Sequence, residues 1–182
     1  MENEDEELFE HIYPNFFTAT ILNWLPLLKL DKYKQLIIDS LAFLVTQKRV
    51  KVYAFVIMPN HIHLMWKILA PYRLSNVKRD FFKFLSNKIK KDLKEFHPNV
   101  LPRFESTQSD RKYQFWQRNP LPIFLYSRKV LEQKLDYVHH NPVKGKWMLV
   151  GSLEQYKWSS FNFYEEETND FEFLSHYMEQ YE

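Results

Sequence analysis

The run RVKVYAFVIMPNHIHLMWKIL, residues 49–69, restricts the fold of this chain more than any other segment. Both halves of the run are rich in β-branched and aromatic residues, which favour strands, and Pro59-Asn60 between them is a turn signal. The run therefore predicts a β-hairpin with strands over 49–58 and 61–69. The apolar character of the second strand places it in the core of a sheet.

Further elements flank this hairpin in a regular order. Strand-like residues fill 15–22, two prolines break a strand-like run over 112–126, and apolar residues recur at helical spacing in 31–47, 75–96 and 127–142. The order β-α-β-β-α-β-α predicts an α+β chain with a ferredoxin-like split βαβ sheet. In such a fold the sheet is antiparallel, its two crossover helices lie on one face, and the last helix is an addition at the C-terminal side.

Two histidines stand one residue apart on the second strand of the hairpin. Side chains alternate along a strand, so Ile62, Leu64 and Trp66 share the face beneath the helices. His61 and His63 then point together from the opposite, open face, where two imidazoles on a rigid strand can bind one metal ion. The alternative interpretation is a pair of core histidines whose ring nitrogens are satisfied by hydrogen bonds inside the protein.

The last predicted helix carries a second set of polar residues. Tyr137 and Asn141 are four residues apart on one helical face, and Lys134 lies one turn earlier on that face. The residues that can dock this helix on the sheet form a neighbouring apolar stripe of Leu131, Leu135 and Val138. If the polar face meets the open side of the sheet, it also meets the two histidines. Otherwise the tyrosine is a packing residue and the asparagine marks an ordinary helix end.

Charge is unevenly distributed along the chain. All 25 Lys and Arg residues lie within residues 11–163, whereas residues 1–10 and the segment after residue 164 carry acidic residues and no base. A body this basic suggests a polyanionic partner such as nucleic acid, and a solubilising surface is the plainer alternative. The residues expected to contact DNA phosphates are Lys78, Arg79, Lys83, Lys88, Lys90, Lys91, Arg111, Lys112, Arg118, Arg128 and Lys129.

Three aromatic residues stand among these cations. Tyr113, Phe115 and Trp116 lie between Lys112 and Arg118. Aromatic side chains interleaved with cations suit stacking on unpaired bases. The same residues suit the core of a strand equally well, and both interpretations stay open.

Composition excludes several other classes of protein. The chain has no cysteine, so disulfides and thiolate metal sites are excluded and a cytoplasmic location is expected. No apolar run reaches the ~18 residues of a membrane span, and the acidic N-terminus is unlike a signal peptide, so no membrane partner is expected. Two glycines are too few for a glycine-rich phosphate loop. The length predicts a single domain, 1–182, with acidic tails at 1–10 and 165–182.

MPNHIHLMW, residues 58–66, resembles the His-hydrophobic-His (HUH) motif of single-tyrosine HUH transposases. LDYVHHNPVKGKWMLVGSLEQYKWSSFNFY, which begins at Leu135, is similar to the tyrosine helix and tail of that family, and the REP-associated tyrosine transposases match best. The resemblance runs from about residue 14 to residue 164. An HxH pair alone is a weak signal, whereas the pair followed by Y-x3-NPVK is more specific. His139 and His140 occupy positions at which relatives vary.

The resemblance implies a DNA transposase, that is, a single-strand endonuclease that cleaves and rejoins hairpin DNA. Tyr137 would attack a backbone phosphate and form a 5′-phosphotyrosine intermediate, which conserves the energy of the broken bond. His61, His63 and Asn141 would hold a divalent metal, Mg²⁺ or Mn²⁺, and a site with imidazole ligands suits Mn²⁺ better. Lys134 and His140 are candidates for proton transfer. The expected partner is single-stranded or hairpin DNA, and relatives occur both as monomers and as homodimers that exchange the tyrosine helix.

Two further functions stay open. A domesticated relative could bind structured DNA without cutting it, although the intact histidines and tyrosine argue against lost chemistry. An unrelated metal-dependent hydrolase could use the same histidine pair. Met65, however, stands where a histidine-triad nucleotide hydrolase needs a third alternating histidine.

Overall fold

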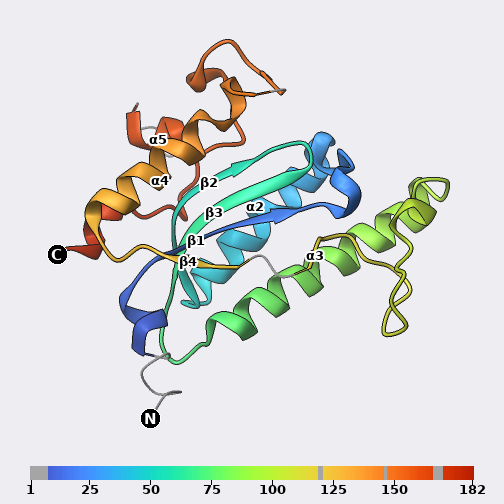
Figure 1. Cartoon of the computed structure of the whole chain (residues 1–182), viewed down its shortest axis with the longest axis horizontal. Helices are drawn as coiled ribbons and strands as arrows, with labels where there is room; N and C mark the ends of the chain where they lie inside the picture. The colour runs from blue at the N-terminus through green and yellow to red at the C-terminus, as the bar shows by residue number, and fades with distance from the viewer. Residues whose placement is uncertain (1–7, 119–120, 146, 166–169) are drawn as a thin grey trace.

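The computed structural model describes residues 8–118, 121–145, 147–165 and 170–182. Its sheet has four strands in the order β2-β3-β1-β4 (Figure 1), and every neighbouring pair is antiparallel. The strands are β1 (Asn15–Thr20), β2 (Val50–Ile57), β3 (His61–Ile68) and β4 (Ile123–Phe124). One helix, α2 (Asp31–Thr46), follows β1, and another, α3 (Leu74–Phe96), follows β3. This is the split βαβ order, so the predicted ferredoxin-like fold is confirmed.

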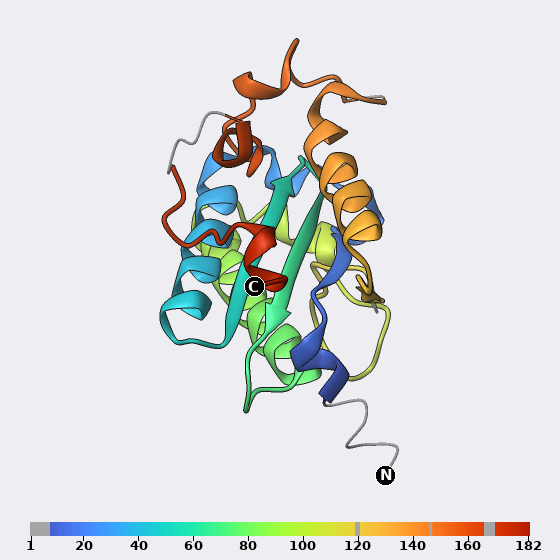
Figure 2. The same cartoon turned by 90° about the vertical axis from the view of Figure 1, so that its left-hand side faces the viewer.

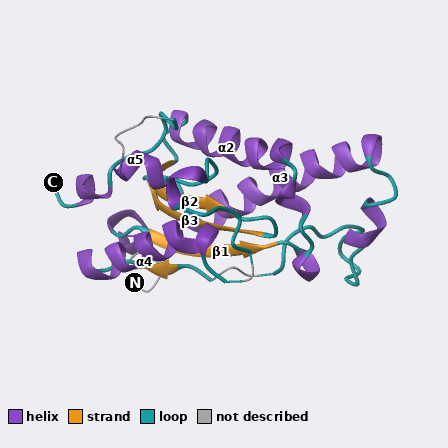
Figure 3. Ribbon diagram, turned by 90° about the horizontal axis from the view of Figure 1, so that it is seen from above, coloured by secondary structure: helices purple, strands orange, loops and turns teal. Residues whose placement is uncertain are grey.

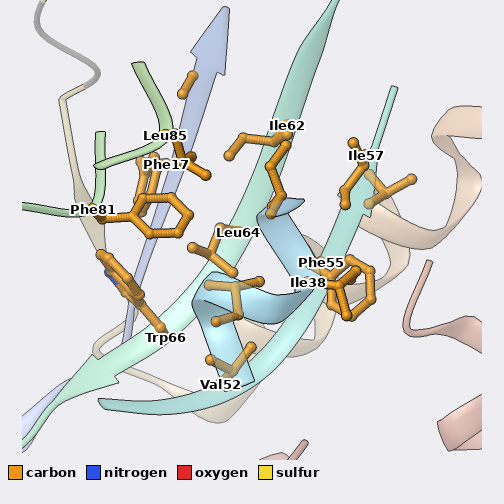
Figure 4. Packing of buried hydrophobic residues seen from close by; sticks show 14 of the residues in the cluster. Phe17, Ile38, Val52, Phe55, Ile57, Ile62, Leu64, Trp66, Phe81 and Leu85 are labelled. Carbon is orange, nitrogen blue, oxygen red and sulfur yellow. The ribbon is translucent and has the colours of Figure 1, made fainter. Parts of the chain in front are cut away.

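The helices α2 and α3 cover one face of the sheet, and Figure 3 shows them on the side opposite to the later helix α4 (Arg128–His140). Phe17 of β1 and Leu64 and Trp66 of β3 point toward them, and each is at most 1% exposed (Figure 4). The only polar atom of the indole is satisfied, because Trp66 Nε1 donates to Asn15 Oδ1 at 3.0 Å. The predicted alternation along β3, with its even-numbered residues beneath the helices, is confirmed.

The two later helices begin in different ways. The sequence predicts that Ser75 and Ser127 are their N-caps. Ser127 does cap α4, because its hydroxyl accepts a hydrogen bond from a backbone N–H of the first turn. The prediction for Ser75 is wrong, since α3 begins at Leu74 and the N–H of Leu74 donates to the Glu10 carboxylate at 2.8 Å. A carboxylate is favourable at the positive end of a helix dipole, so the acidic N-terminal segment supplies a cap that no local pattern shows.

The strand-like run predicted over 112–126 forms little sheet. β4 has two residues, which pair with the beginning of β1, and Trp116 forms an isolated bridge with Ile21. Proline has no N–H to donate, so Pro122 interrupts the ladder just before β4. The edge of the sheet beside β1 is therefore covered by an irregular segment rather than by a full strand.

The acidic C-terminal segment folds back across the face of the sheet that α2 and α3 leave open, as Figure 2 shows. Leu174 forms a parallel bridge with Val52, whose carbonyl accepts the N–H of Ser175 at 2.9 Å. Glu179 forms an ion pair with Lys51 at 2.8 Å. The sequence leaves open whether the acidic ends contact the basic body, and the described part of this end does so.

Within the described ranges, no helix combines the length and the apolar composition that are required to cross a membrane.

We predict that Phe81→Ala destabilises the protein by about 3–5 kcal/mol, because the Phe81 side chain packs in the core against Trp66 and its loss leaves a cavity. Phe84→Ala is the matched control, since Phe84 lies on the same helix and is 47% exposed. Its free energy of unfolding should change by less than about 1 kcal/mol. Urea denaturation followed by circular dichroism measures both values, and equal losses would contradict this assignment of the core.

Candidate active site

The helix α4 lies on the open face of the sheet, where it packs against β2 and β3. Leu131 and Val138 are both fully buried, which is the predicted docking by the apolar stripe. Leu135 is partly buried against the same core. Because the stripe faces the sheet, the neighbouring polar face of α4 is brought over the odd-numbered residues of β3.

This docking brings the predicted tyrosine and histidines together. The ring centroids of His61 and His63 are 4.8 Å apart, and those of His63 and Tyr137 are 5.1 Å apart. Phe16 of β1 stacks on His63 with ring centroids 5.6 Å apart. The histidine is 3% exposed, whereas Tyr137 is 48% exposed, so the tyrosine is accessible to a ligand that approaches from solvent.

Asn141 lies at the end of α4 beside the same histidine. Its Nδ2 donates to the carbonyl of Tyr137 at 2.8 Å, which turns its side chain back toward the last turn of the helix. Its side-chain amide also acts on His63 and favours the protonated ring. The predicted catalytic and metal-binding residues of a single chain therefore lie close together in space. They are His61, His63, Tyr137 and Asn141.

His63 is held as a neutral ring. The pKa of His63 is lowered to about 3, mainly by burial and also by the charges of His61 and Lys134, whereas Asn141 acts in the opposite direction. Its Nδ1 lies 2.7 Å from Thr18 Oγ1, and its Nε2 is buried with no hydrogen-bond partner in the described part of the chain. A metal ligand must be neutral imidazole with an available lone pair, and this ring meets both conditions.

The donor atoms at this site fit a divalent cation that accepts nitrogen as well as oxygen ligands. A buried ring nitrogen without a partner is the kind of atom that a bound ion satisfies. Among the described residues, no group of three or more His, Cys, Asp or Glu side chains could hold a metal ion. The site therefore offers two imidazoles and one carboxamide without a carboxylate, which suits Mn²⁺ better than Mg²⁺.

The two candidates for proton transfer have different surroundings. Lys134 Nζ lies 5.5 Å from the centre of the Tyr137 ring and 5.0 Å from that of Phe16, so its positive charge is close to the tyrosine. His140 Nδ1 instead lies 2.9 Å from the Asp136 carboxylate. Lys134 therefore contacts the Tyr137 ring, whereas His140 pairs with Asp136.

His139 belongs to the packing of α4 rather than to the site. It is 6% exposed, and its Nε2 lies 2.9 Å from Ser160 Oγ. Its ring also contacts that of Tyr164, with centroids 5.5 Å apart. The pKa of His139 is lowered to about 4, mainly by burial and also by the charge of His140, whereas Asp136 acts in the opposite direction. This histidine joins α4 to the C-terminal segment.

A groove of about 900 Å³ lies between α3 and the segment 110–118. Its lining includes polar side chains of Asn87, Gln114 and Gln117 and one acid, Asp110. The predicted DNA-binding residues that line it are Arg79, Lys83, Lys90, Arg111, Lys112 and Arg118. Residues separated by up to 39 positions in the sequence therefore form one basic surface, suited to a polyanion.

The other predicted DNA-binding residues do not line this groove. Lys78 is half-buried with its Nζ 5.2 Å from the centre of the Phe17 ring, and burial lowers its pKa. Lys88 and Lys91 are exposed elsewhere on α3. Arg128 and Lys129 lie at the start of α4, where Arg128 forms an ion pair with Glu132 at 2.7 Å.

The sequence left two interpretations open for the three aromatic residues near the groove, namely stacking on unpaired bases and packing in the core. The structure assigns different positions to the three. Phe115 and Trp116 are 3% and 8% exposed and pack against Phe104 and Phe82. Both are core residues, so stacking on bases is not available to them in this conformation. Tyr113 is only partly buried and lines the groove, so stacking on a base remains compatible with its position.

Sequence reasoning did not identify three residues that surround the histidines. Phe16 and Thr18 contact His63 from β1, and Asn60 Oδ1 lies 2.7 Å from His61 Nδ1. Thr18 pairs with His63 in the β1–β3 register. Phe16 and Thr18 are two residues apart on β1 and therefore share one face of the sheet. Only the strand register shows which residue of β3 stands opposite each of them.

Comparisons with known proteins bear on this arrangement. No family model matches the chain. A curated protein of Haemophilus influenzae, named as a REP-associated tyrosine transposase, is 27% identical over 114 residues, which are 60% of this chain and 57% of that protein. The chain thus matches little more than half the length of this relative.

Two solved structures resemble the fold. A REP-associated tyrosine transposase bound to a REP hairpin superposes with a TM-score of 0.60 at 21% identity, over 84% of this chain and 78% of that one. A protein of Deinococcus radiodurans described as a transposase has a TM-score of 0.38 at 17% identity, over 69% and 88% of the two chains. The second value is too low to support an inference.

The fold and the residues gathered on it define a class: a ferredoxin-like sheet with two histidines on its open face and a tyrosine on the helix that crosses that face. The sequence similarity and the shared fold confirm the resemblance carried by the motifs. The chain is thus similar in sequence to a curated REP-associated tyrosine transposase, and it shares its fold with a solved protein of that name.

We predict that acid destabilises the protein partly through His139. The pKa of His139 is lower in the folded protein than its ordinary value of about 6.5, so between about pH 6.5 and pH 4 only the unfolded chain binds this proton. The free energy of unfolding should therefore fall as the pH falls through this window. His139→Gln removes the titration and can still donate a hydrogen bond to Ser160.

Urea denaturation of both proteins between pH 7 and pH 4.5 provides the test. The stability advantage of the wild type over His139→Gln should shrink by about 2 kcal/mol toward the acidic end, in proportion to the pKa difference. An advantage that stays constant across this range would contradict the assignment.

Proposed function

We propose that this protein cleaves and rejoins single-stranded DNA next to a hairpin, as a tyrosine transposase of the HUH type. The observation that carries the proposal is the contact between Tyr137 on α4 and His63 on β3, with ring centroids 5.1 Å apart and His61 beside them. A tyrosine of this exposure next to a buried, neutral imidazole is suited to nucleophilic attack at a metal-assisted site.

In the proposed reaction, the Tyr137 hydroxyl attacks a backbone phosphorus atom. A bond forms between the phenolic oxygen and phosphorus, the bond from phosphorus to the 3′ oxygen breaks, and that oxygen leaves with a proton as a 3′-hydroxyl. The DNA stays attached through a 5′-phosphotyrosine. The reverse attack by a 3′-hydroxyl restores the phosphodiester and releases the tyrosine, so the exchange needs no nucleotide triphosphate.

The side chains of this chain support each requirement of the step. His61, His63 and Asn141 would hold a divalent cation, Mg²⁺ or Mn²⁺, which would lower the barrier by neutralising charge on the phosphate. Lys134, with its Nζ 5.5 Å from the centre of the Tyr137 ring, stabilises the phenolate that develops as the proton leaves. The proton itself passes to water or to the leaving 3′ oxygen.

The basic groove beside α3 would hold the DNA. Its six lysine and arginine side chains suit phosphate contacts, and its carboxamides suit the edges of unpaired bases. DNA is the proposed partner, which agrees with a relative of the same fold that is bound to a REP hairpin. Because Tyr137 meets the histidines of its own chain, a homodimer that exchanges α4 is not needed to assemble the site. A cysteine-free protein that acts on DNA is proposed to work in the cytoplasm.

We predict that Tyr137→Phe abolishes the covalent product. Wild type and variant are incubated with Mn²⁺ and labelled single-stranded hairpins from the DNA that flanks the gene, and the products are separated on a denaturing gel. The wild type should give a covalent protein–DNA band, and Tyr137→Phe should give none because the nucleophilic oxygen is missing. Tyr126→Phe is the matched control, since Tyr126 is also exposed, at 59%, and should keep the band.

Other outcomes of this experiment point to other functions. Binding of the hairpin without a covalent band in the wild type would favour a relative that binds structured DNA and does not cut it. Failure to bind DNA at all would reject the proposal and leave a metal-dependent hydrolase as the alternative.

We predict that Lys83→Gln weakens binding of the same hairpin several-fold. Lys83 is exposed on α3 and lines the groove, so its loss should remove about one phosphate contact. The slope of log K against log salt should become shallower by about 0.7–0.9. Lys48→Gln is the control, because Lys48 is exposed but lies in the turn before β2 and not in the groove. Equal effects of the two substitutions on fluorescence anisotropy would show that the groove has no special role.

A further inference from the structure

Two polar side chains from outside the histidine pair hold the Nδ1 atoms of its rings. Asn60 Oδ1 lies 2.7 Å from His61 Nδ1, and Thr18 Oγ1 lies 2.7 Å from His63 Nδ1. We propose that Asn60 and Thr18 are positioning residues that hold both imidazoles in the Nδ1-protonated tautomer and so direct both Nε2 lone pairs toward one divalent cation. This inference rests on the metal-binding role that the proposed function gives to the two histidines.

The orientation of the Asn60 side chain decides the tautomer of His61. Asn60 is 1% exposed, and its Nδ2 donates to the carbonyl of Trp24 at 3.2 Å. A carbonyl can only accept, so the amide nitrogen must face Trp24 and the amide oxygen must face the imidazole. An amide oxygen also only accepts, so His61 Nδ1 carries the proton and His61 Nε2 carries the lone pair.

The backbone around Asn60 holds this side chain in place. Its own carbonyl accepts the N–H of Ile21 at 2.8 Å, which ties the turn before β3 to the end of β1. Trp24 has a φ of 56°, in the left-handed region, and its carbonyl faces Asn60. The side-chain amide therefore has hydrogen-bonding partners at both ends and little freedom to flip.

Burial decides the tautomer of His63. A threonine hydroxyl can donate or accept, so the distance from Thr18 alone allows either tautomer. If the hydroxyl donated to Nδ1, the ring proton would be on Nε2, which is buried and makes no hydrogen bond in the described part of the chain; the Asn141 amide favours the protonated ring but is not within hydrogen-bonding geometry of this nitrogen. A buried N–H without an acceptor is rarer and less tolerable than a lone pair without a donor. Thr18 therefore accepts from Nδ1, and Nε2 keeps its lone pair.

The sheet register makes the arrangement of Thr18 and His63 rigid. Thr18 of β1 stands directly opposite His63 of β3, so the backbone pairing of two central strands sets the position of the hydroxyl. Hydrogen bonds to the second nitrogen of a ligating imidazole orient the ring and raise its basicity, and their loss commonly weakens metal binding about 10- to 100-fold. Asn60 and Thr18 would each do this for one ring.

The tautomers can be measured without any metal. In the metal-free protein labelled with ¹⁵N at histidine, two-bond ¹H–¹⁵N correlation spectra distinguish a protonated Nδ1 from a protonated Nε2. The wild type should show Nδ1 protonated in both His61 and His63. Thr18→Val should shift His63 toward the other tautomer, Asn60→Ala should do the same for His61, and Thr18→Ser should restore the wild-type pattern. A protonated Nε2 on either ring of the wild type would overturn the inference.

Mn²⁺ affinity, measured by isothermal titration calorimetry, gives the second readout. Thr18→Val should raise the dissociation constant about 10- to 100-fold, and Thr18→Ser should stay close to the wild type. Thr20→Val is the matched control, because Thr20 shares the face of Thr18 on β1 but stands opposite His61 rather than His63.

The two measurements separate this inference from the proposed function. If the tautomers are as expected but the wild type binds no Mn²⁺, the metal-binding role of the histidines is wrong, and the positioning role of Asn60 and Thr18 fails with it. If Mn²⁺ binds but Thr18→Val and Thr20→Val affect the affinity equally, the metal site stands and Thr18 has no positioning role.

Discussion

The two-residue alternation of side chains along β3 is the constraint on which the rest of the structure depends. Leu64 and Trp66 point toward α2 and α3 and close the core, and this burial holds the strand rigid. The same backbone must then present His61 and His63 from the other face. A shift of one residue in the register would exchange the two sets, which would bury the imidazoles beneath the helices and expose the core. The stability of the sheet and the geometry of the site therefore share one cause.

The open face of the sheet becomes a site because other segments cover only part of it. α4 docks through Leu131 and Val138, and the C-terminal segment joins β2 through Val52. The helix is held from both sides, by the sheet beneath it and by the contact of His139 with Ser160. Tyr137 is consequently placed over His63 by packing that is independent of the reaction. In the function that we propose for Tyr137, a nucleophile positioned in this way would lose little entropy when a substrate arrives.

Local patterns predicted much of this molecule, and their failures have identifiable causes. The hairpin, both crossover helices and the Ser127 cap follow from alternation, helical spacing and cap chemistry, which act over a few residues. Ser75 was a plausible cap by the same local rule, but the carboxylate of Glu10 reaches the helix start from a distant part of the chain. The run over 112–126 resembles a strand in composition, yet its prolines and its place at the edge leave only a short ladder. Composition likewise could not show which aromatic residues near the groove are buried.

The sequence by itself determined the chemical groups and the faces on which they stand: two imidazoles on one side of β3, and a tyrosine and an asparagine on one side of α4. These properties depend on the periods of strand and helix, so they can be counted along the chain. Only the tertiary structure decided that the two faces meet, that Thr18 stands opposite His63, and that basic residues of α3 and of the segment 110–118 line one groove. Such contacts depend on strand register and on how packed elements exclude water, and both are set by the whole chain rather than by neighbouring residues.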